Sequence, residues 1–168
     1  MPKLIIDKLP RIIKARKELE KELGIKIANR GREIYIKGSP ENVYLAEKVI
    51  LALDFGFPMS CALLIKKQEC GFAIININEH SNSKNTGRAK ARIIGRNGKV
   101  LQTLCSISEC FFEVNGHDVG IIGDLENIKC VREAIIMLIK GAKHGNVYGF
   151  LEKKKSQPIT DLGLKKKE

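Results

Sequence analysis

Apolar and polar residues alternate in two regions of the chain, in the pattern of half-buried strands. Each region contains a pair of predicted strands followed directly by a helix whose apolar residues fall on one face. Ser39 with Pro40 gives one helix an N-cap and a first-turn proline, and Asp124 caps the other. The four predicted strands are residues 25–27, 34–36, 110–114 and 119–121.

These two regions are copies of one unit. Residues 24–53 align with residues 109–138 without a gap, so every aligned pair is 85 positions apart. The matched positions include apolar residues of both strands, the glycine that follows the second strand, and a Glu-Asn pair in the helix. An internal match of this length predicts two units with the same fold.

Upstream of the repeat the two copies differ. In the second copy the predicted order is strand, short helix, glycine turn and helix, at residues 71–77, 88–94, 95–98 and 99–108. In the first copy a strand over residues 3–6 is followed by a single helix from Pro10 to Leu23. At the offset of 85, Pro10–Ile13 stands where the second copy has Gly95–Gly98. The first copy is therefore expected to lack the glycine turn.

The domain organisation follows from this comparison. We expect one unit over residues 1–56 and a second over 71–142. Residues 57–70 are predicted to form a short packed connector helix, because they lack the glycine and serine run of a flexible linker. Residues 143–168 form a basic C-terminal extension, which we expect to be disordered beyond Ser156.

The charge of the chain indicates a polyanionic partner. Lys and Arg number 30 against 19 Asp and Glu, giving a formal net charge of +11. Nucleic acid is the first candidate and an anionic membrane surface the second, while a lysine-rich surface that serves only solubility is the third. Residues 80–108 hold six Lys or Arg and no acidic residue. Glycines interrupt this window, which disfavours a membrane-surface helix.

Other classes of function find little support in the sequence. No apolar run approaches the roughly 20 residues that span a bilayer, and the short apolar run at the N-terminus is not expected to be a signal peptide. The five cysteines lack metal-ligand spacing with the three histidines, so we expect no metal and no cofactor. They suit a protein of the reducing cytoplasm. The sequence shows no nucleophile–base pair, no paired carboxylates and no P-loop, so we expect the protein not to be an enzyme.

The order of elements in the second half, with Gly95-Arg96-Asn97-Gly98 between two helices, resembles the type I KH domain, a module that binds RNA and single-stranded DNA. A tandem pair that ends in HGNVYGFLEKKK from His144 is similar to the archaeal Dim-two or partner-of-Nob family of small-subunit ribosome assembly factors. This resemblance implies an α+β fold of two type I KH-like units. Each would be a three-stranded antiparallel sheet with helices on one face, and the first would lack the GxxG turn.

The resemblance also implies a site. A KH module clamps about four nucleotides with its GxxG loop, which is here Gly95–Gly98. Arg96 and Lys99 would add charge against the phosphates, and the helix that starts at Lys99 would offer free N–H groups to an anion. The remaining candidates are Arg88, Lys90 and Arg92 on the approach, and Ile94 on the apolar floor of a base-binding groove.

Phe111 has two possible roles. It is out of phase with the buried alternation of its strand, so it could stack on a base in the same groove. Alternatively, it could pack against the first KH copy. The sequence does not decide between these two possibilities.

The family resemblance implies that the protein binds single-stranded small-subunit rRNA near its 3′ end and positions processing partners there. Those partners would be the rRNA dimethyltransferase, the Nob-type endonuclease or a translation initiation factor. The first copy would then be a structural or protein-docking half. Two alternatives stay open: a protein-interaction scaffold with vestigial RNA binding, and a KH subunit of an RNA-degrading or translational complex.

Overall fold

The computed structural model describes residues 2–81 and 86–156. The second lysine run of the expected extension, Lys165–Lys167, lies outside the described residues.

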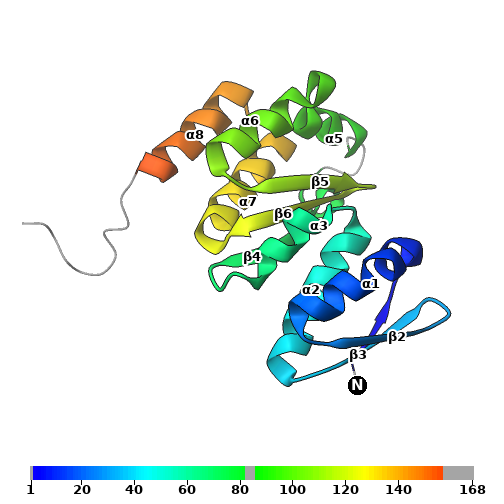
Figure 1. Cartoon of the computed structure of the whole chain (residues 1–168). Helices are drawn as coiled ribbons and strands as arrows, with labels where there is room; N and C mark the ends of the chain where they lie inside the picture. The colour runs from blue at the N-terminus through cyan, green and yellow to red at the C-terminus, as the bar shows by residue number, and fades with distance from the viewer. Residues whose placement is uncertain (1, 82–85, 157–168) are drawn as a thin grey trace, which may run out of the picture.

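The first unit is a three-stranded antiparallel sheet with two helices packed against it (Figure 1). Its central strand is β3, so the strand order is β1-β3-β2. A short helix and a 3-10 turn, α3 (Met59–Ala62) and η1 (Leu63–Lys66), connect it to the second unit. The elements of the first unit are β1 (Lys3–Ile5), α1 (Leu9–Leu23), β2 (Lys26–Arg30), β3 (Glu33–Lys37) and α2 (Pro40–Phe55).

The second unit repeats this sheet with strand order β4-β6-β5. Here the helical segment before the strand hairpin is split by a turn. The elements are β4 (Cys70–Asn76), α4 (Ile77–His80), α5 (Thr86–Ile94), η2 (Arg96–Gly98), α6 (Lys99–Ser108), β5 (Phe111–Asn115), β6 (Asp118–Asp124), α7 (Leu125–Ile139) and α8 (His144–Ser156). Two three-stranded antiparallel sheets with helices confirm the expected α+β class and its two KH-like units.

Corresponding elements of the two units begin at corresponding positions of the internal repeat. Strands β2 and β5 begin 85 positions apart, and so do helices α2 and α7. The glycine that both copies share after the second strand has a packing reason. A Cβ at Gly38 would lie 3.1 Å from Ile25 Cγ2, and a Cβ at Gly123 would lie 2.6 Å from Cys110 Sγ. Ile25 and Cys110 are themselves a repeat pair, so both copies make the same close contact.

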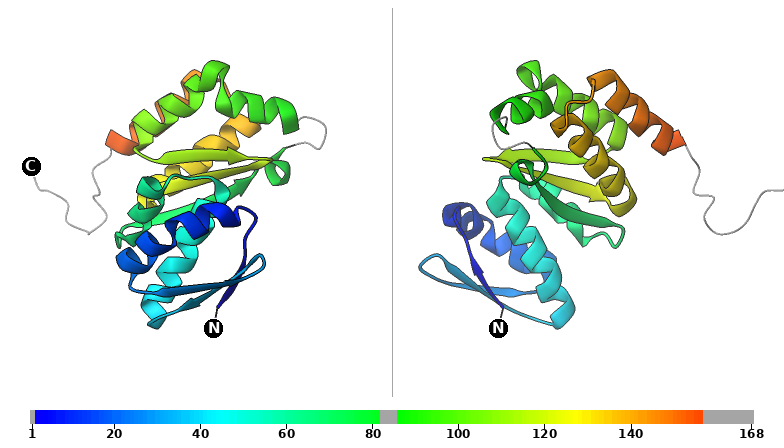
Figure 2. Two further views of the ribbon diagram at one scale, coloured as in Figure 1. Left: turned by 45° about the vertical axis from the view of Figure 1, so that its right-hand side comes forward. Right: turned by 180° about the vertical axis from the view of Figure 1, so that it is seen from behind.

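The two units stack so that the second sheet lies between its own helices and the first unit (Figures 1 and 2). Ile122 of β6 is fully buried in the core cluster of the first unit. Phe55, Phe57 and Phe72 form an aromatic cluster at this junction, with ring centroids 5.7–6.0 Å apart. Asn115 Nδ2 also donates to the carbonyl of Phe55 at 3.2 Å. These contacts pack the two units against each other, and the connector bounds 57–70 stay a prediction.

The segment that follows α7 differs from the sequence-based expectation. Residues 144–156 form helix α8, which packs on α6 and α7. Val147 and Leu151 on this helix are buried in the core of the second unit. We therefore propose that the second unit extends to residue 156 and that the boundary expected at residue 142 cuts through it.

Gly120 on β6 tests the contact between the units. A Cβ at this position would lie 2.7 Å from Phe55 Cε1 and 2.8 Å from Phe57 Cε2. Because rigid rings cannot move aside cheaply, Gly120→Ala is expected to lower the free energy of unfolding by about 1–3 kcal/mol. Thermal or urea unfolding measures this change. Gly149→Ala adds the same atom to α8 where no neighbour lies within 4 Å, and it should not destabilise the protein. Equal stability of the two variants would contradict the tight contact.

Candidate nucleic-acid interface

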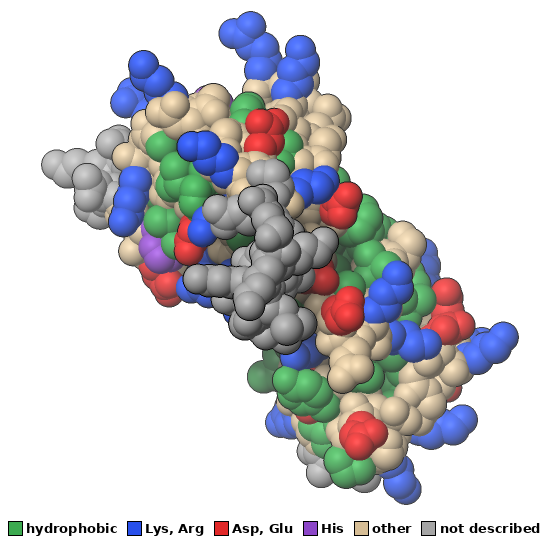
Figure 3. All heavy atoms as spheres, turned by 90° about the vertical axis from the view of Figure 1, so that its left-hand side faces the viewer, with side chains coloured by type: hydrophobic (Ala, Val, Ile, Leu, Met, Phe, Trp, Pro, Cys, Tyr) green, Lys and Arg blue, Asp and Glu red, His purple; other side chains and the backbone are tan. Residues whose placement is uncertain are grey.

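Basic side chains alone do not locate a binding site on this protein. Lys and Arg side chains project from both ends of the face in Figure 3, with acidic side chains interspersed. The backbone geometry between α5 and α6 is more informative, because it is built around residues that ordinary side chains could not replace.

Gly95 is required by the turn that separates α5 from α6. Its φ of 75° and ψ of 175° lie in a region that only glycine occupies readily. A Cβ there would also lie 2.3 Å from Val100 Cγ2 and 2.8 Å from Val100 N. Asn97 adopts a left-handed conformation that asparagine tolerates better than most residues, with φ 55°. The turn therefore has one defined shape.

Gly98 ends the turn and is the N-cap of α6, with φ 75° and no side-chain hydrogen bond to the helix. A Cβ at Gly98 would meet nothing within 4 Å. Helix α1 also has no side-chain cap, at Lys8, but the helix that follows each strand hairpin has one. Ser39 accepts from Asn42 N at the start of α2, and Asp124 accepts from Glu126 N at the start of α7. The first turn of α6 thus lacks a side-chain cap, while the N–H groups of Gly98 and Lys99 donate to the carbonyls of Gly95 and Arg96.

The predicted cations of the turn are at its surface. Arg96 and Asn97 are exposed, and so is Lys99 in the first turn of α6. Among the described residues, no carboxylate lies within ion-pair distance of Arg96 or Lys99. The turn therefore brings together two available cations and an uncapped helix N-terminus.

Helix α5 divides the other predicted residues between two of its sides. Lys90 and Ile94 are one helical turn apart and lie together, and both are half-buried. Arg88 and Arg92 are also one helical turn apart and lie together on another side of the helix. The buried positions Ala89 and Ile93 face the core. The structure thus does not assemble the four residues into one surface.

Arg92 is engaged in a structural contact. Its Nη1 donates to the carbonyl of Leu138 at 3.0 Å, and its Nη2 donates to the carbonyl of Ala142. His144 Nε2 donates in turn to the carbonyl of Arg92 at 3.0 Å. These bonds tie the end of α5, just before the turn, to the end of α7 and the start of α8. Arg92 thus holds the end of α5 in place, and its contact with the phosphates stays a prediction.

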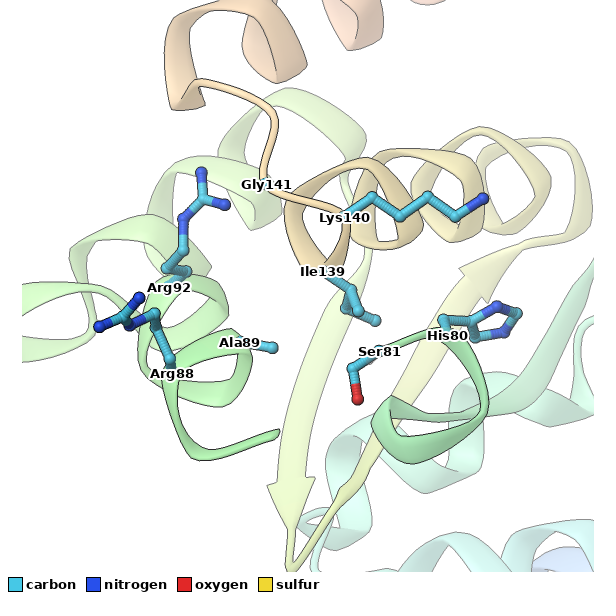
Figure 4. Close-up of a pocket in the computed structure, with 8 residues that line it drawn as sticks. All are labelled: His80, Ser81, Arg88, Ala89, Arg92, Ile139, Lys140 and Gly141. Atoms are coloured by element: carbon cyan, nitrogen blue, oxygen red, sulfur yellow. The ribbon is translucent and has the colours of Figure 1, made fainter. Parts of the chain in front are cut away.

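A hollow of about 430 Å3 lies beside α5 on the side of Arg88 and Arg92 (Figure 4). Lys140 and His80 also line it. In Figure 4 the Arg92 side chain points upward and that of Arg88 to the left, while Lys140 and His80 point to the right. Their charged ends diverge, so this hollow does not focus charge on one ligand.

Phe111 lies on the sheet face opposite to the one expected for base stacking. It is paired directly with Ile122, which packs in the core of the first unit, whereas Phe112 is paired with Ile121 in the core of the second unit. Directly opposed residues in an antiparallel pair point to the same face. Phe111, 40% exposed, therefore looks toward the first unit and does not join Ile94. Phe112 is the aromatic residue on the face of the sheet that its helices cover. Its alternation with Cys110 and Val114 in the sequence could have identified it as that residue.

The cysteines at the C-terminal end of α6 and just after it are poor nucleophiles. Burial raises the pKa of the Cys110 thiol to about 11, and burial also raises the pKa of Cys105. All five cysteines are free. Across residues 2–81 and 86–156, no three His, Cys, Asp or Glu side chains are placed to share a metal ion. No helix within these residues has the length and apolar character to cross a membrane.

Comparison with known proteins agrees with this geometry. Residues 71–156, which include the turn and α8, match the family described as eukaryotic-type KH domain (KH-domain type I), in the form of the second KH domain of PNO1. The chain belongs to the PNO1/Dim2 family of KH-domain proteins. The resemblance drawn from the glycine turn and the segment after His144 is thereby confirmed.

Individual relatives extend the similarity beyond the second unit. A KH domain-containing protein of Methanocaldococcus jannaschii is 32% identical over 84% of this chain and 66% of its own length. A pre-rRNA-processing protein pno1 of Emericella nidulans is 28% identical over 64% of this chain and 43% of its own. The chain therefore spans less than half the length of this fungal relative and slightly less than two thirds of the archaeal one.

A solved structure matches both KH-like units. In the crystal structure of an a/eIF2alpha-aDim2p-rRNA complex from Pyrococcus horikoshii, one chain is 29% identical and superimposes with a TM-score of 0.83. The match covers 93% of this chain and 94% of that one. The stacked arrangement of the two units is thus similar in the two proteins.

The positioning role of Arg92 can be separated from phosphate binding. Arg92→Ala removes the guanidinium donor from the carbonyls of Leu138 and Ala142, although Leu138 O keeps its bond from Gly141 N. The free energy of unfolding should therefore fall by about 1–3 kcal/mol. Arg88→Ala removes an exposed cation from the same side of α5 and should change it by less than about 0.5 kcal/mol. Urea unfolding of both variants makes the comparison. If Arg92→Ala were as stable as Arg88→Ala, the contact with Leu138 and Ala142 would not support the turn.

Proposed function

We propose that this protein binds a single-stranded segment of small-subunit rRNA near its 3′ end through the second KH unit. The observation that carries the proposal is the uncapped N-terminus of α6, reached through a glycine turn and flanked by exposed Arg96 and Lys99. Backbone N–H groups and two cations at one point favour a phosphate. Glycines at the turn let the nucleic-acid backbone come close.

The roles of the remaining residues follow from their positions. Arg96, Asn97 and Lys99 contact phosphates and fix the strand on the protein. Lys90 and Ile94 lie on one side of α5 and contact the nucleotides that the turn presents. Phosphate contacts set register, whereas contacts with base edges and faces set sequence preference. Arg92 supports the turn from behind.

The comparisons support a place in ribosome assembly. The fungal relatives are named for pre-rRNA processing, and the Pyrococcus relative was crystallised with rRNA and a/eIF2alpha. By analogy, this protein acts in the cytoplasm as a non-catalytic factor that holds rRNA for others. Its protein partners would be an rRNA dimethyltransferase, a Nob-type endonuclease or a translation initiation factor.

The first unit is not expected to clamp RNA with its residues 10–13. These residues lie in the first turns of the continuous helix α1. Arg11, the counterpart of Arg96 in the repeat, donates to the carbonyl of Phe57 at 3.0 Å. Ile12, the counterpart of Asn97, is buried. Neither residue is free to contact a phosphate as the second unit does.

Charge reversal at the turn tests the clamp. Arg96→Asp with Asn97→Asp should leave the fold intact and reduce affinity for a 3′-terminal small-subunit rRNA segment by at least about a hundredfold, because carboxylates replace the groups that face the phosphates. The measurement is fluorescence anisotropy with that RNA and a scrambled RNA over a salt series.

The matched control is Ile13→Asp with Lys14→Asp, which changes the net charge by the same amount at exposed positions of the first unit. It should weaken binding only slightly. Equal losses in both variants would attribute binding to net charge alone. Unchanged affinity in a folded Arg96→Asp, Asn97→Asp variant would remove the clamp and favour a protein scaffold.

A further inference from the structure

The first unit carries a hollow of its own. The first unit lies at the end of the molecule opposite to α5 and α6 (Figure 1). The hollow has a volume of about 680 Å3 and lies where α1 ends, β2 begins and β3 ends. Four lysines and one carboxylate line it: Lys17, Glu20, Lys21, Lys26 and Lys37. Among the described residues, none of the four lysines forms an ion pair.

Two of these lysines are neighbours on adjacent strands of the sheet. Lys26 of β2 and Lys37 of β3 are directly opposed in the antiparallel register, and both are exposed. Like charges in this position destabilise a strand pair. An anion between them would remove that repulsion, so the fold itself maintains a place that favours negative charge.

The one carboxylate of the hollow is already used. Glu20 Oε1 accepts from the backbone N–H of Ile27 at 2.8 Å and from Arg16 Nε at 3.4 Å. The bond from Ile27 is the main reason that the pKa of Glu20 lies below its usual range, with smaller contributions from Arg16 and the charge of Lys26. Glu20 thus secures the start of β2 and leaves most of the positive charge of the lysines unbalanced.

The second unit lacks this cluster. At the repeat offset of 85, the four lysines correspond to Gln102, Ser106, Phe111 and Ile122. Two of these uncharged residues lie on α6, which packs against α8, and the other two on the sheet face toward the first unit. The lysine cluster is therefore not a requirement of the shared fold but a property of the first unit.

We propose that this lysine-lined hollow binds the phosphodiester backbone of RNA and gives the protein a second, sequence-independent contact with its RNA. The inference rests on the proposed function, since it concerns the same RNA beyond the segment held by Gly95–Gly98. The first unit contacts RNA here through lysines on α1, β2 and β3, with no glycine turn.

The chemistry of the hollow favours RNA over an acidic protein segment. Its apolar lining residue, Ile25, is only 3% exposed, so the hollow offers no exposed apolar side chain to anchor a peptide. Lysine is also depleted in protein–protein interfaces, where aromatic residues and arginine are enriched. Flexible ammonium groups that need no fixed partner geometry suit a phosphate backbone.

The test compares two RNAs from the 3′ end of small-subunit rRNA. The short RNA is little longer than the roughly four nucleotides that one KH clamp holds, and the long RNA continues for several times that length. The test variant carries Lys21→Glu, Lys26→Glu and Lys37→Glu. The matched control carries Lys129→Glu, Arg132→Glu and Lys154→Glu, three exposed positions of the second unit that do not line the hollow. Circular dichroism and thermal unfolding check that both variants are folded, and a lysine-to-glutamine version of the test variant serves if the glutamates impair folding.

The test variant should bind the short RNA as tightly as the wild type does, and the long RNA at least about tenfold more weakly. For the long RNA, the slope of log affinity against log salt should be shallower by about 2, because three phosphate contacts are lost. Equal losses of long-RNA affinity in the test and control variants would overturn the proposal, since net charge would then explain both. Unchanged binding of the long RNA by the test variant would also overturn the proposal. If the test variant in that case lost a binding of polyglutamate that the wild type shows, the hollow would be a site for an acidic protein partner.

Failure of the clamp gives a different result. If the wild type bound the short RNA no better than a scrambled one, and Arg96→Asp with Asn97→Asp changed nothing, the proposed function would fail at the second unit. The difference between the test and control variants on the long RNA would still report on the hollow.

Discussion

The packing of the second sheet on Phe55 and Phe57 determines much of the rest of the structure. A three-stranded sheet with helices on one face leaves its other face apolar, and that face must be covered. Here the first unit covers it, and Gly120 allows the rings to approach the central strand. The units therefore share apolar surface around Ile122. Within residues 2–81 and 86–156, no second unit covers the outer face of the first sheet.

This packing lets two copies of one unit do different things. The repeat keeps the strand hairpin, the following helix and the close glycine contact in both copies, because all of them are needed to form the core. What precedes the hairpin has diverged. One copy has the continuous helix α1. On this helix Arg11, the counterpart of Arg96, donates to the carbonyl of Phe57. The other copy has a turn that can exist only with Gly95. Of the two copies, the second thus has the glycine turn on which the proposed clamp depends.

Much of the fold could be predicted from the sequence because local pattern and tertiary packing agree along the repeat. The limits of α6 match the predicted residues 99–108. Helix α8 was missed because two glycines and a lysine run weaken the helical pattern, although Val147 and Leu151 have helical spacing. The face of Phe111 and the bonds of Arg92 depend on residues far along the chain, which periodicity cannot identify.

The distribution of charge and apolar surface bears on how such a protein could select its RNA. Phosphate contacts at the turn and at the lysine hollow would raise affinity for any RNA, and their strength falls with salt. Selection must then come from the few groups that face the bases. Aromatic residues form only 5% of the chain, and Phe111 faces away from α5. Shape and hydrogen bonding around Ile94 would therefore have to discriminate between bases, while two separated backbone contacts would limit which strand lengths bind well.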